Sequence, residues 1–121
     1  MPRELRLEAD GLFFAAQEWG ARGQMPVLAL HGWLDNSASF NVLAPQLKNL
    51  HLVALDLAGH GQSDHRPGSA PYNIWEDVAE IFAVADQLGW SRFALMGHSR
   101  GAMISMLAAG TFPERISHLA M

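Results

Sequence analysis

Apolar and polar positions alternate along the first part of the chain and predict a β-hairpin. Residues 3–19, RELRLEADGLFFAAQEW, form two alternating runs on either side of Asp10-Gly11. Alternation with a period of two is typical of a strand with one buried face. Asp-Gly between two such runs is a strong hairpin signal. We therefore expect the chain to open with two antiparallel strands.

Three later runs are apolar nearly throughout and predict strands that are covered on both faces. They are MPVLAL (25–30), HLVALD (51–56) and RFALMG (92–97), and RISHLAM (115–121) predicts a further strand. A short apolar run without alternation is typical of a buried, parallel strand.

Segments with apolar residues at helical spacing lie between these strands. A helix is predicted over residues 37–48, where Pro45 limits its length. A second helix starts at Asn73 and keeps one apolar face as far as Gly89, and a third, apolar nearly all round, covers residues 101–109. Strands and helices that alternate after an opening hairpin predict an α/β fold with a mostly parallel, doubly wound sheet. Ligands of such sheets bind beyond the carboxyl ends of the strands.

The amino-acid composition argues against several classes of function. The chain has 121 residues, of which 50% are hydrophobic and 17% charged, and a formal net charge of −4. We expect no nucleic-acid partner, because such partners require clustered Lys and Arg. Apolar stretches are too short to span a bilayer, and the charged amino terminus does not resemble a signal peptide. With no cysteine, neither disulfides nor thiolate metal sites can form, and we expect a cytoplasmic protein.

The last predicted strand-to-helix turn holds the main candidate for chemistry. In FALMGHSRGAMISMLAAG (93–110), Ser99 stands between Gly97 and Gly101 and matches the G-x-S-x-G pattern of a nucleophile elbow. In such an elbow the serine occupies a strained backbone region, and the glycines are pressed together without room for a Cβ. The hydroxyl is then exposed at the amino end of a helix, whose dipole favours developing negative charge. We predict that Ser99 is a nucleophile.

Two backbone amides are predicted to form an oxyanion hole beside this serine. One is the amide of Arg100, and the other comes from the loop His31-Gly32-Trp33, where we favour Trp33. His31 is interpreted as a residue that braces this loop through hydrogen bonds, and His98 as a packed residue of the elbow. The alternative interpretation is a phosphate turn or a bend with an idle serine, but neither G-x-G-x-x-G nor G-x-x-x-x-G-K-[ST] is present.

Three stretches together resemble the α/β-hydrolase superfamily, and within it the serine hydrolase-like group of esterases. They are LALHGWLDNSASFNVLAPQL, LDLAGHGQSDHRP and FALMGHSRGAMISMLAAGTFPERI, and the likeness runs from about residue 12 to residue 121. The resemblance implies a Ser–Asp/Glu–His triad, an oxyanion hole from the Trp33 and Arg100 amides, a small-molecule acyl substrate, and no metal or organic cofactor. Dehalogenase-like and some epoxide-hydrolase-like relatives carry Asp at the elbow, and Ser99 departs from that pattern.

The catalytic acid and base are not expected within this chain. In this fold they follow the serine in the order Asp/Glu, then His. Glu114 is predicted at the far end of the sheet and His118 inside a strand, so neither is expected to serve Ser99. Residues 1–121 are therefore interpreted as the amino-terminal part of a single α/β-hydrolase domain, inactive alone. The alternatives are a non-catalytic binding domain, an inactive fragment, an acyltransferase or a C–C hydrolase.

The remaining candidates receive mainly structural interpretations. Trp33, Phe40 and Met103 are candidates to line an acyl pocket, although for Met103 we favour a place in the helix core. Trp75 is assigned to packing. The turn 56–63 resembles a structural turn of the family. The six histidines lack metal-ligand spacing, so we expect no metal site.

Overall fold

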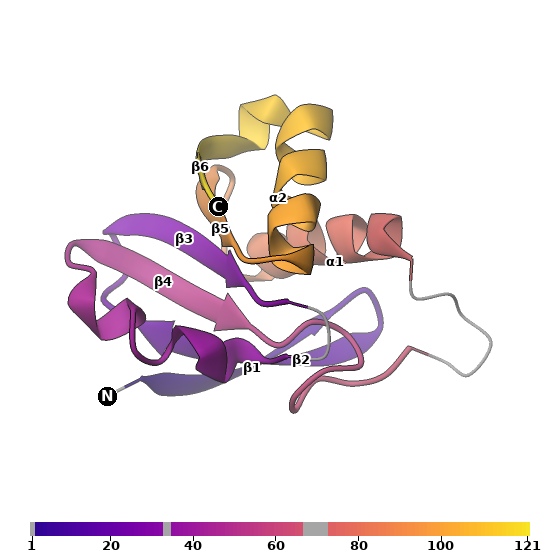
Figure 1. Cartoon of the computed structure of the whole chain (residues 1–121), viewed down its shortest axis with the longest axis horizontal. Coiled ribbons are helices and arrows are strands. Elements are labelled where there is room, and N and C mark those ends of the chain that lie inside the picture. Colours follow the sequence, from indigo (N-terminus) through magenta and orange to yellow (C-terminus); the bar gives the residue numbers. More distant parts are fainter. Residues whose placement is uncertain (1, 33–34, 67–72) are drawn as a thin grey trace.

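The structure is a computed structural model, and it describes residues 2–32, 35–66 and 73–121. Six strands of this described part form one mixed sheet in the order β1-β2-β4-β3-β5-β6 (Figure 1). The strands are β1 (Arg3–Ala9), β2 (Leu12–Trp19), β3 (Met25–Leu30), β4 (Leu50–Leu55), β5 (Phe93–Gly97) and β6 (Ile116–Ala120).

The opening hairpin is confirmed. β1 and β2 are antiparallel, and Ala9 pairs with Leu12 across a two-residue turn. Both turn residues have positive φ, 52° at Asp10 and 79° at Gly11, which is the geometry that matches the twist of paired strands. β2 also runs antiparallel to β4, whereas β3 is parallel to both β4 and β5, and β5 is parallel to β6. The predicted α/β class and mostly parallel sheet are therefore confirmed.

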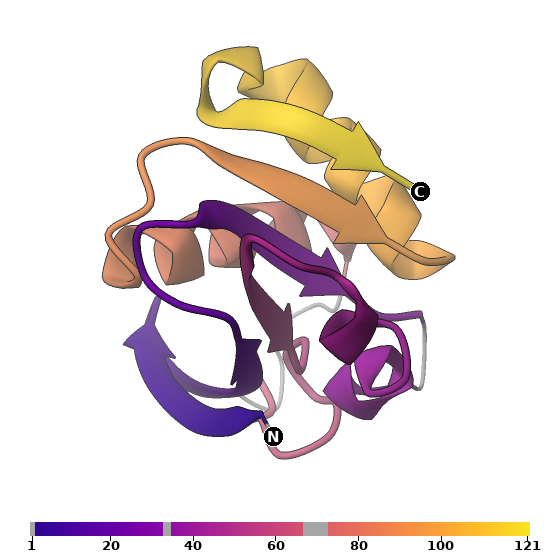
Figure 2. The same cartoon turned by 90° about the vertical axis from the view of Figure 1, so that its left-hand side faces the viewer.

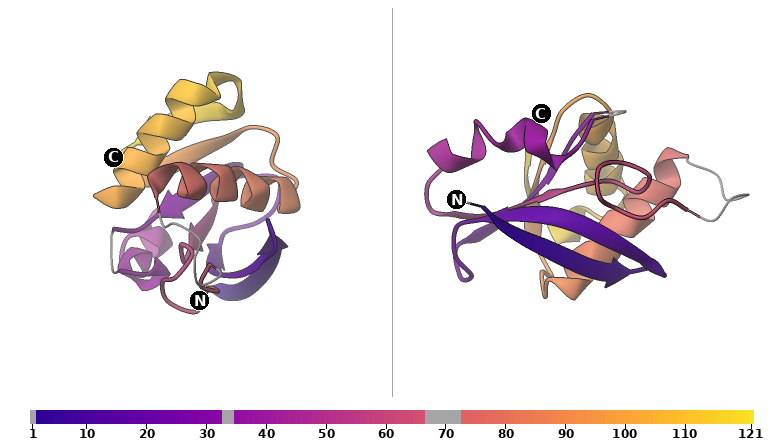
Figure 3. Two further views of the ribbon diagram at one scale, coloured as in Figure 1. Left: turned by 90° about the vertical axis from the view of Figure 1, so that its right-hand side faces the viewer. Right: turned by 90° about the horizontal axis from the view of Figure 1, so that it is seen from below.

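Two helices, α1 (Ile74–Gln87) and α2 (Arg100–Thr111), cover one face of the sheet. Figure 2 shows them behind the strands, and the left view of Figure 3 shows them in front. α1 begins as predicted, because the side chain of Asn73 caps it by accepting a hydrogen bond from the Glu76 amide. The buried side chains between helices and sheet form the main core cluster, which includes Leu28, Leu30, Val53, Leu55, Ile81, Leu95 and Ile104.

The opposite face is covered by two short 3₁₀ helices, η1 (Ser37–Phe40) and η2 (Ala44–Gln46). The α-helix predicted over residues 37–48 is therefore wrong, and Pro45 near the start of η2 is the residue that the sequence already marked as limiting. Phe40 packs there against residues of the strands, in a second cluster with Trp19, Val27, Ala29, Ala44, Leu52, Ala54 and Ala94.

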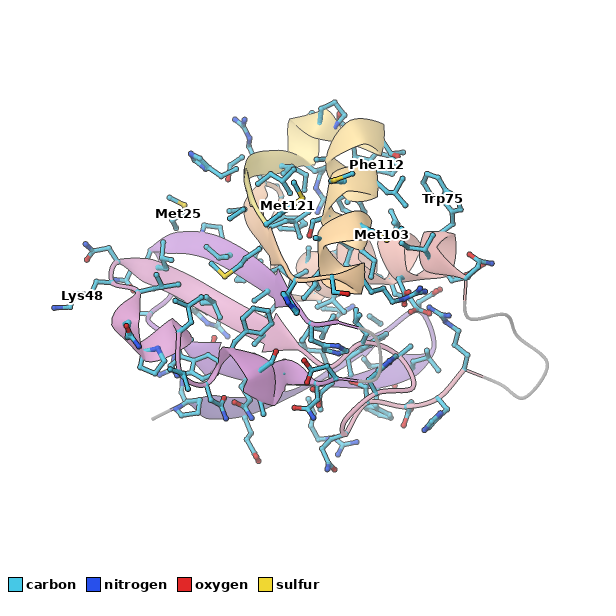
Figure 4. The ribbon with its side chains drawn as sticks, viewed as in Figure 1. Met25, Lys48, Trp75, Met103, Phe112 and Met121 are labelled. Atoms are coloured by element: carbon cyan, nitrogen blue, oxygen red, sulfur yellow. The ribbon has the colours of Figure 1, made fainter. Side chains whose placement is uncertain are left out.

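Several large apolar side chains remain exposed. Met103 and Trp75 are 57% and 55% exposed, so the expectations of a helix core and of packing are wrong for them. Figure 4 shows Trp75 projecting from the start of α1 and Phe112 lying at the end of α2, which a third 3₁₀ helix, η3 (Pro113–Arg115), follows. Within the described ranges, no helix is both long and apolar enough to cross a bilayer.

Candidate active site

The turn between β5 and α2 places a strained serine just beyond the carboxyl end of β5. Ser99 is exposed and has φ 58° and ψ −116°. A residue with a side chain rarely adopts a positive φ, and such a conformation costs about 1–3 kcal/mol unless the surroundings impose it. Its carbonyl accepts hydrogen bonds from the Ala102 and Met103 amides, so the helix starts immediately after it.

Two glycines allow this turn to form. A Cβ on Gly97 would collide with the carbonyl of Gly101 and lie 2.6 Å from the Ala102 nitrogen. A Cβ on Gly101 would collide with the carbonyl of Leu30 at the end of β3. The absence of both side chains therefore lets strand, helix and neighbouring strand approach within backbone contact.

The loop after β3 lies against the elbow. Leu30 pairs with Gly97 in the parallel register, and the His98 amide donates a hydrogen bond to the Leu30 carbonyl at 3.1 Å. A Cβ on Gly32 would lie only 3.3 Å from the Cβ of Ser99. The structure thus brings the backbone of Gly32 close to the side chain of Ser99. Trp33, our second amide donor and pocket candidate, lies outside the described residues.

His31 joins this loop to the loop that follows β4. Its side chain is fully buried, its Nε2 accepts the Leu57 amide at 3.0 Å, and its Nδ1 lies 2.6 Å from the Gly32 carbonyl. Nδ1 therefore carries the proton and donates to that carbonyl. Burial lowers the pKa of His31 below its ordinary value of 6.5, although the hydrogen bond to Gly32 acts in the opposite direction. The two hydrogen bonds therefore hold a neutral ring between the two loops.

Asp56 organises the loop after β4. Its carboxylate accepts the amides of Ser37 at 2.7 Å and Gln62 at 3.0 Å. Ser63 donates its hydroxyl to the Asp56 carbonyl and accepts the Ala15 amide. A Cβ on Gly61 would press into the carboxylate. The structural interpretation of this turn is confirmed, because these contacts satisfy backbone groups.

Two candidates, Phe40 and His98, lie elsewhere than the sequence suggested, whereas His118 lies within a strand as predicted. Phe40 is 6% exposed and belongs to the second core cluster, so we assign it to packing instead of to an acyl pocket. His98 is exposed, and the expectation of a packed residue is wrong. His118 is exposed on β6, the last strand of the sheet order. In the part of the chain that is described, no three His, Asp or Glu side chains cluster as metal ligands would.

Sequence reasoning missed an ionic network beside the elbow. Arg66 of the loop after β4 binds Asp77 and Glu80 of α1, and Asp77 also binds the Arg100 guanidinium at 2.8 Å. Burial raises the pKa of Glu80 above 4.5, although Arg66 opposes that shift. The available signal was spacing, because Asp77 stands at helical distance from the buried Ile81 and Val84 and so lies on the buried side of α1.

Comparisons with known proteins agree with this geometry. The family model for the alpha/beta hydrolase fold matches residues 25–121. A human serine hydrolase-like protein is 41% identical over 119 residues, which are 98% of this chain and 59% of that protein. A hypothetical protein of Pseudomonas aeruginosa PAO1 is 51% identical in its crystal structure, with a TM-score of 0.94 over 96% of this chain and 41% of that one.

A third similar structure is epoxide hydrolase A of Mycobacterium thermoresistibile, at 28% identity and a TM-score of 0.91, which covers 98% of this chain and 38% of that one. The chain belongs to the α/β-hydrolase family. It resembles the serine hydrolase-like members of that family and spans about three fifths of the length of the human relative.

Proposed function

We propose that the chain is the nucleophile-bearing part of a serine hydrolase that cleaves carboxylic esters or related acyl compounds. The observation that carries this proposal is the exposed Ser99 at φ 58°, between two glycines whose missing Cβ atoms permit the turn. Strained backbone conformations of this kind cluster at functional sites. A serine without a function would have no reason to adopt one. The Gly32 backbone beside it supplies the second wall of the site.

In the proposed reaction, Ser99 Oγ attacks the acyl carbon while a histidine base takes its proton. The carbonyl oxygen becomes an oxyanion that the amides of Arg100 and Trp33 stabilise, aided by the positive end of the α2 dipole. Collapse of this intermediate breaks the acyl–oxygen bond, and the histidine returns its proton to the leaving alcohol. Water then hydrolyses the acyl-enzyme by the same steps, with no metal or organic cofactor.

We assign the histidine base and its orienting carboxylate to the remainder of the full-length protein. His31 is engaged at both ring nitrogens, and His118 lies exposed on β6. The presence of a serine rather than an aspartate supports acyl chemistry over the epoxide opening named for one structural neighbour. A chain without cysteine is compatible with a reducing compartment, and we propose the cytoplasm.

The test is turnover of p-nitrophenyl esters of graded chain length by the full-length protein. We expect Ser99→Ala to reduce turnover to the background rate and Ser91→Ala, at an exposed serine before β5, to leave it unchanged. Turnover that persists in Ser99→Ala contradicts the assignment of the nucleophile. Turnover absent from the wild-type protein across the panel contradicts the ester hydrolase itself.

A further inference from the structure

The side chain of Arg100 is held by an ion pair that connects two helices. Arg100 is the first residue of α2, and its Nη2 lies 2.8 Å from Oδ2 of Asp77 in the first turn of α1. The other oxygen of Asp77, Oδ1, accepts a hydrogen bond from Nη2 of Arg66 at 2.8 Å. Asp77 therefore bridges two arginines that come from different segments of the chain.

Glu80 adds a second carboxylate to this network. Glu80 accepts two hydrogen bonds from Arg66, from Nε to Oε2 at 2.9 Å and from Nη2 to Oε1 at 2.8 Å. Among the residues that the structure describes, two cations thus face two anions. The side chains of Arg66, Asp77 and Glu80 are only 4–5% exposed and that of Arg100 is 21% exposed. Moving one of these side chains away would leave a buried charge without its partner, which strongly destabilises the folded chain. Each side chain therefore restricts the positions of the others.

We propose that Asp77 is a positioning residue for the oxyanion hole. By holding the guanidinium of Arg100, it restrains the residue whose own backbone amide would bind the oxyanion. This inference rests on the proposed function, because it assigns a role within that oxyanion hole. The Arg66–Glu80 pair extends the restraint to the loop after β4, and the four residues together fix the start of α2 against α1.

The location of the restraint explains why it is effective. The peptide between Ser99 and Arg100 follows a residue at φ 58°, in a conformation that relaxes unless neighbouring contacts maintain it. Gly97 and Gly101 permit the turn sterically, but neither has a side chain that could anchor it. The Asp77–Arg100 ion pair supplies an anchor from outside the turn. A small displacement of an oxyanion donor reduces the stabilisation of the transition state more than it reduces the binding of substrate.

The experiment measures the second-order rate of labelling by a fluorophosphonate in the full-length protein. We expect Asp77→Asn and Arg100→Met each to lower this rate roughly tenfold, less than the approximately 10²–10³-fold cost of losing a donor outright. The double variant should label no more slowly than Asp77→Asn alone, since that single variant already removes the interaction between Asp77 and Arg100. Arg100→Lys should recover part of the rate, because its ammonium can still pair with Asp77.

The matched control is Asp86→Asn. It removes the same charge from the same helix and breaks another inter-element ion pair, that of Asp86 with Arg115. We expect its labelling rate to equal that of the wild-type protein. Where Asp77→Asn fails to fold, Arg100→Met carries the test, because its side chain is the most exposed of the four.

Ester kinetics separate positioning from direct substrate contact. Positioning predicts a lower kcat with nearly unchanged KM in Arg100→Met. A raised KM with unchanged kcat overturns the inference and assigns Arg100 to substrate binding. Wild-type labelling rates in both single variants overturn the inference alone, whereas absence of labelling in the wild-type protein overturns the inference and the proposed function together.

Discussion

At the scale of single residues, two glycines of α2 provide a matched test of the elbow. A Cβ on Gly101 would collide with the Leu30 carbonyl, whereas a Cβ on Gly110 would have no atom within 4 Å. We expect Gly101→Ala to lower the melting temperature, at a cost of about 1–3 kcal/mol, and to abolish labelling of Ser99. Gly110→Ala should keep labelling and leave stability equal or up to about 1 kcal/mol higher, because alanine favours the helix. Equal behaviour of the two variants in thermal melts would contradict this account of the turn.

Because His31 is buried, we expect the stability of the folded chain to depend on pH. Its pKa in the folded chain is below 6.5, because burial disfavours the charged ring. Between that value and the unfolded value, the unfolded chain binds one more proton, so the free energy of unfolding falls as the pH falls below 6.5. The slope is at most about 1.4 kcal/mol per pH unit.

Urea unfolding at pH 7.5 and 5.5 measures this effect. The wild-type protein should lose more stability between the two values than His31→Asn, in which the titrating ring is absent. Burial raises the pKa of Glu18, but its bonds to His51 and Arg3 hold the value below 4.5, and so it does not titrate in this range. Equal losses in wild-type and variant proteins would show that His31 is not the neutral brace described.

At the scale of elements, the loop after β4 is predicted to depend on one carboxylate. Asp56 accepts the amides of Ser37 and Gln62 on its two oxygens. Asp56→Asn keeps the shape but turns an amide N–H₂ toward one of these donors, at a cost of about 1–3 kcal/mol. We expect a lower denaturant midpoint with an unchanged m-value. Unchanged stability would show that solvent replaces these bonds without loss.

Some elements could be predicted from local sequence patterns and others could not. The hairpin was predictable because Asp-Gly strongly favours a two-residue turn between strands. The elbow was predictable because the spacing of serine and glycines in G-x-S-x-G is typical of that turn. The helix expected over residues 37–48 was not, since helical spacing around Pro45 is equally compatible with two 3₁₀ turns packed on a sheet.

At the scale of the whole molecule, β6 is the last strand of the described sheet and carries an exposed apolar residue, Leu119. An unpaired strand edge with apolar side chains favours pairing with another chain. We expect the isolated 121-residue polypeptide to self-associate with rising concentration in light scattering, and Leu119→Lys to reduce this association. A monomer at all concentrations would contradict the prediction.

Contacts between elements that lie far apart in the sequence could not be predicted from the sequence. The Asp77–Arg100 ion pair joins residues 23 positions apart, and no local pattern specifies such a pairing. The exposure of Met103 depends on what packs over α2 and not on the helix's own spacing. Ser99 was found because its chemistry and its backbone geometry are encoded within five residues, whereas contacts between elements arise only in the folded chain.

Locating the covalent adduct tests the central claim most directly. The full-length protein is treated with a fluorophosphonate, digested, and its modified peptide sequenced by mass spectrometry. The account predicts a single adduct on Ser99 Oγ, which disappears in Ser99→Ala. An adduct on any other serine, or labelling of Ser99→Ala at the wild-type rate, would contradict it.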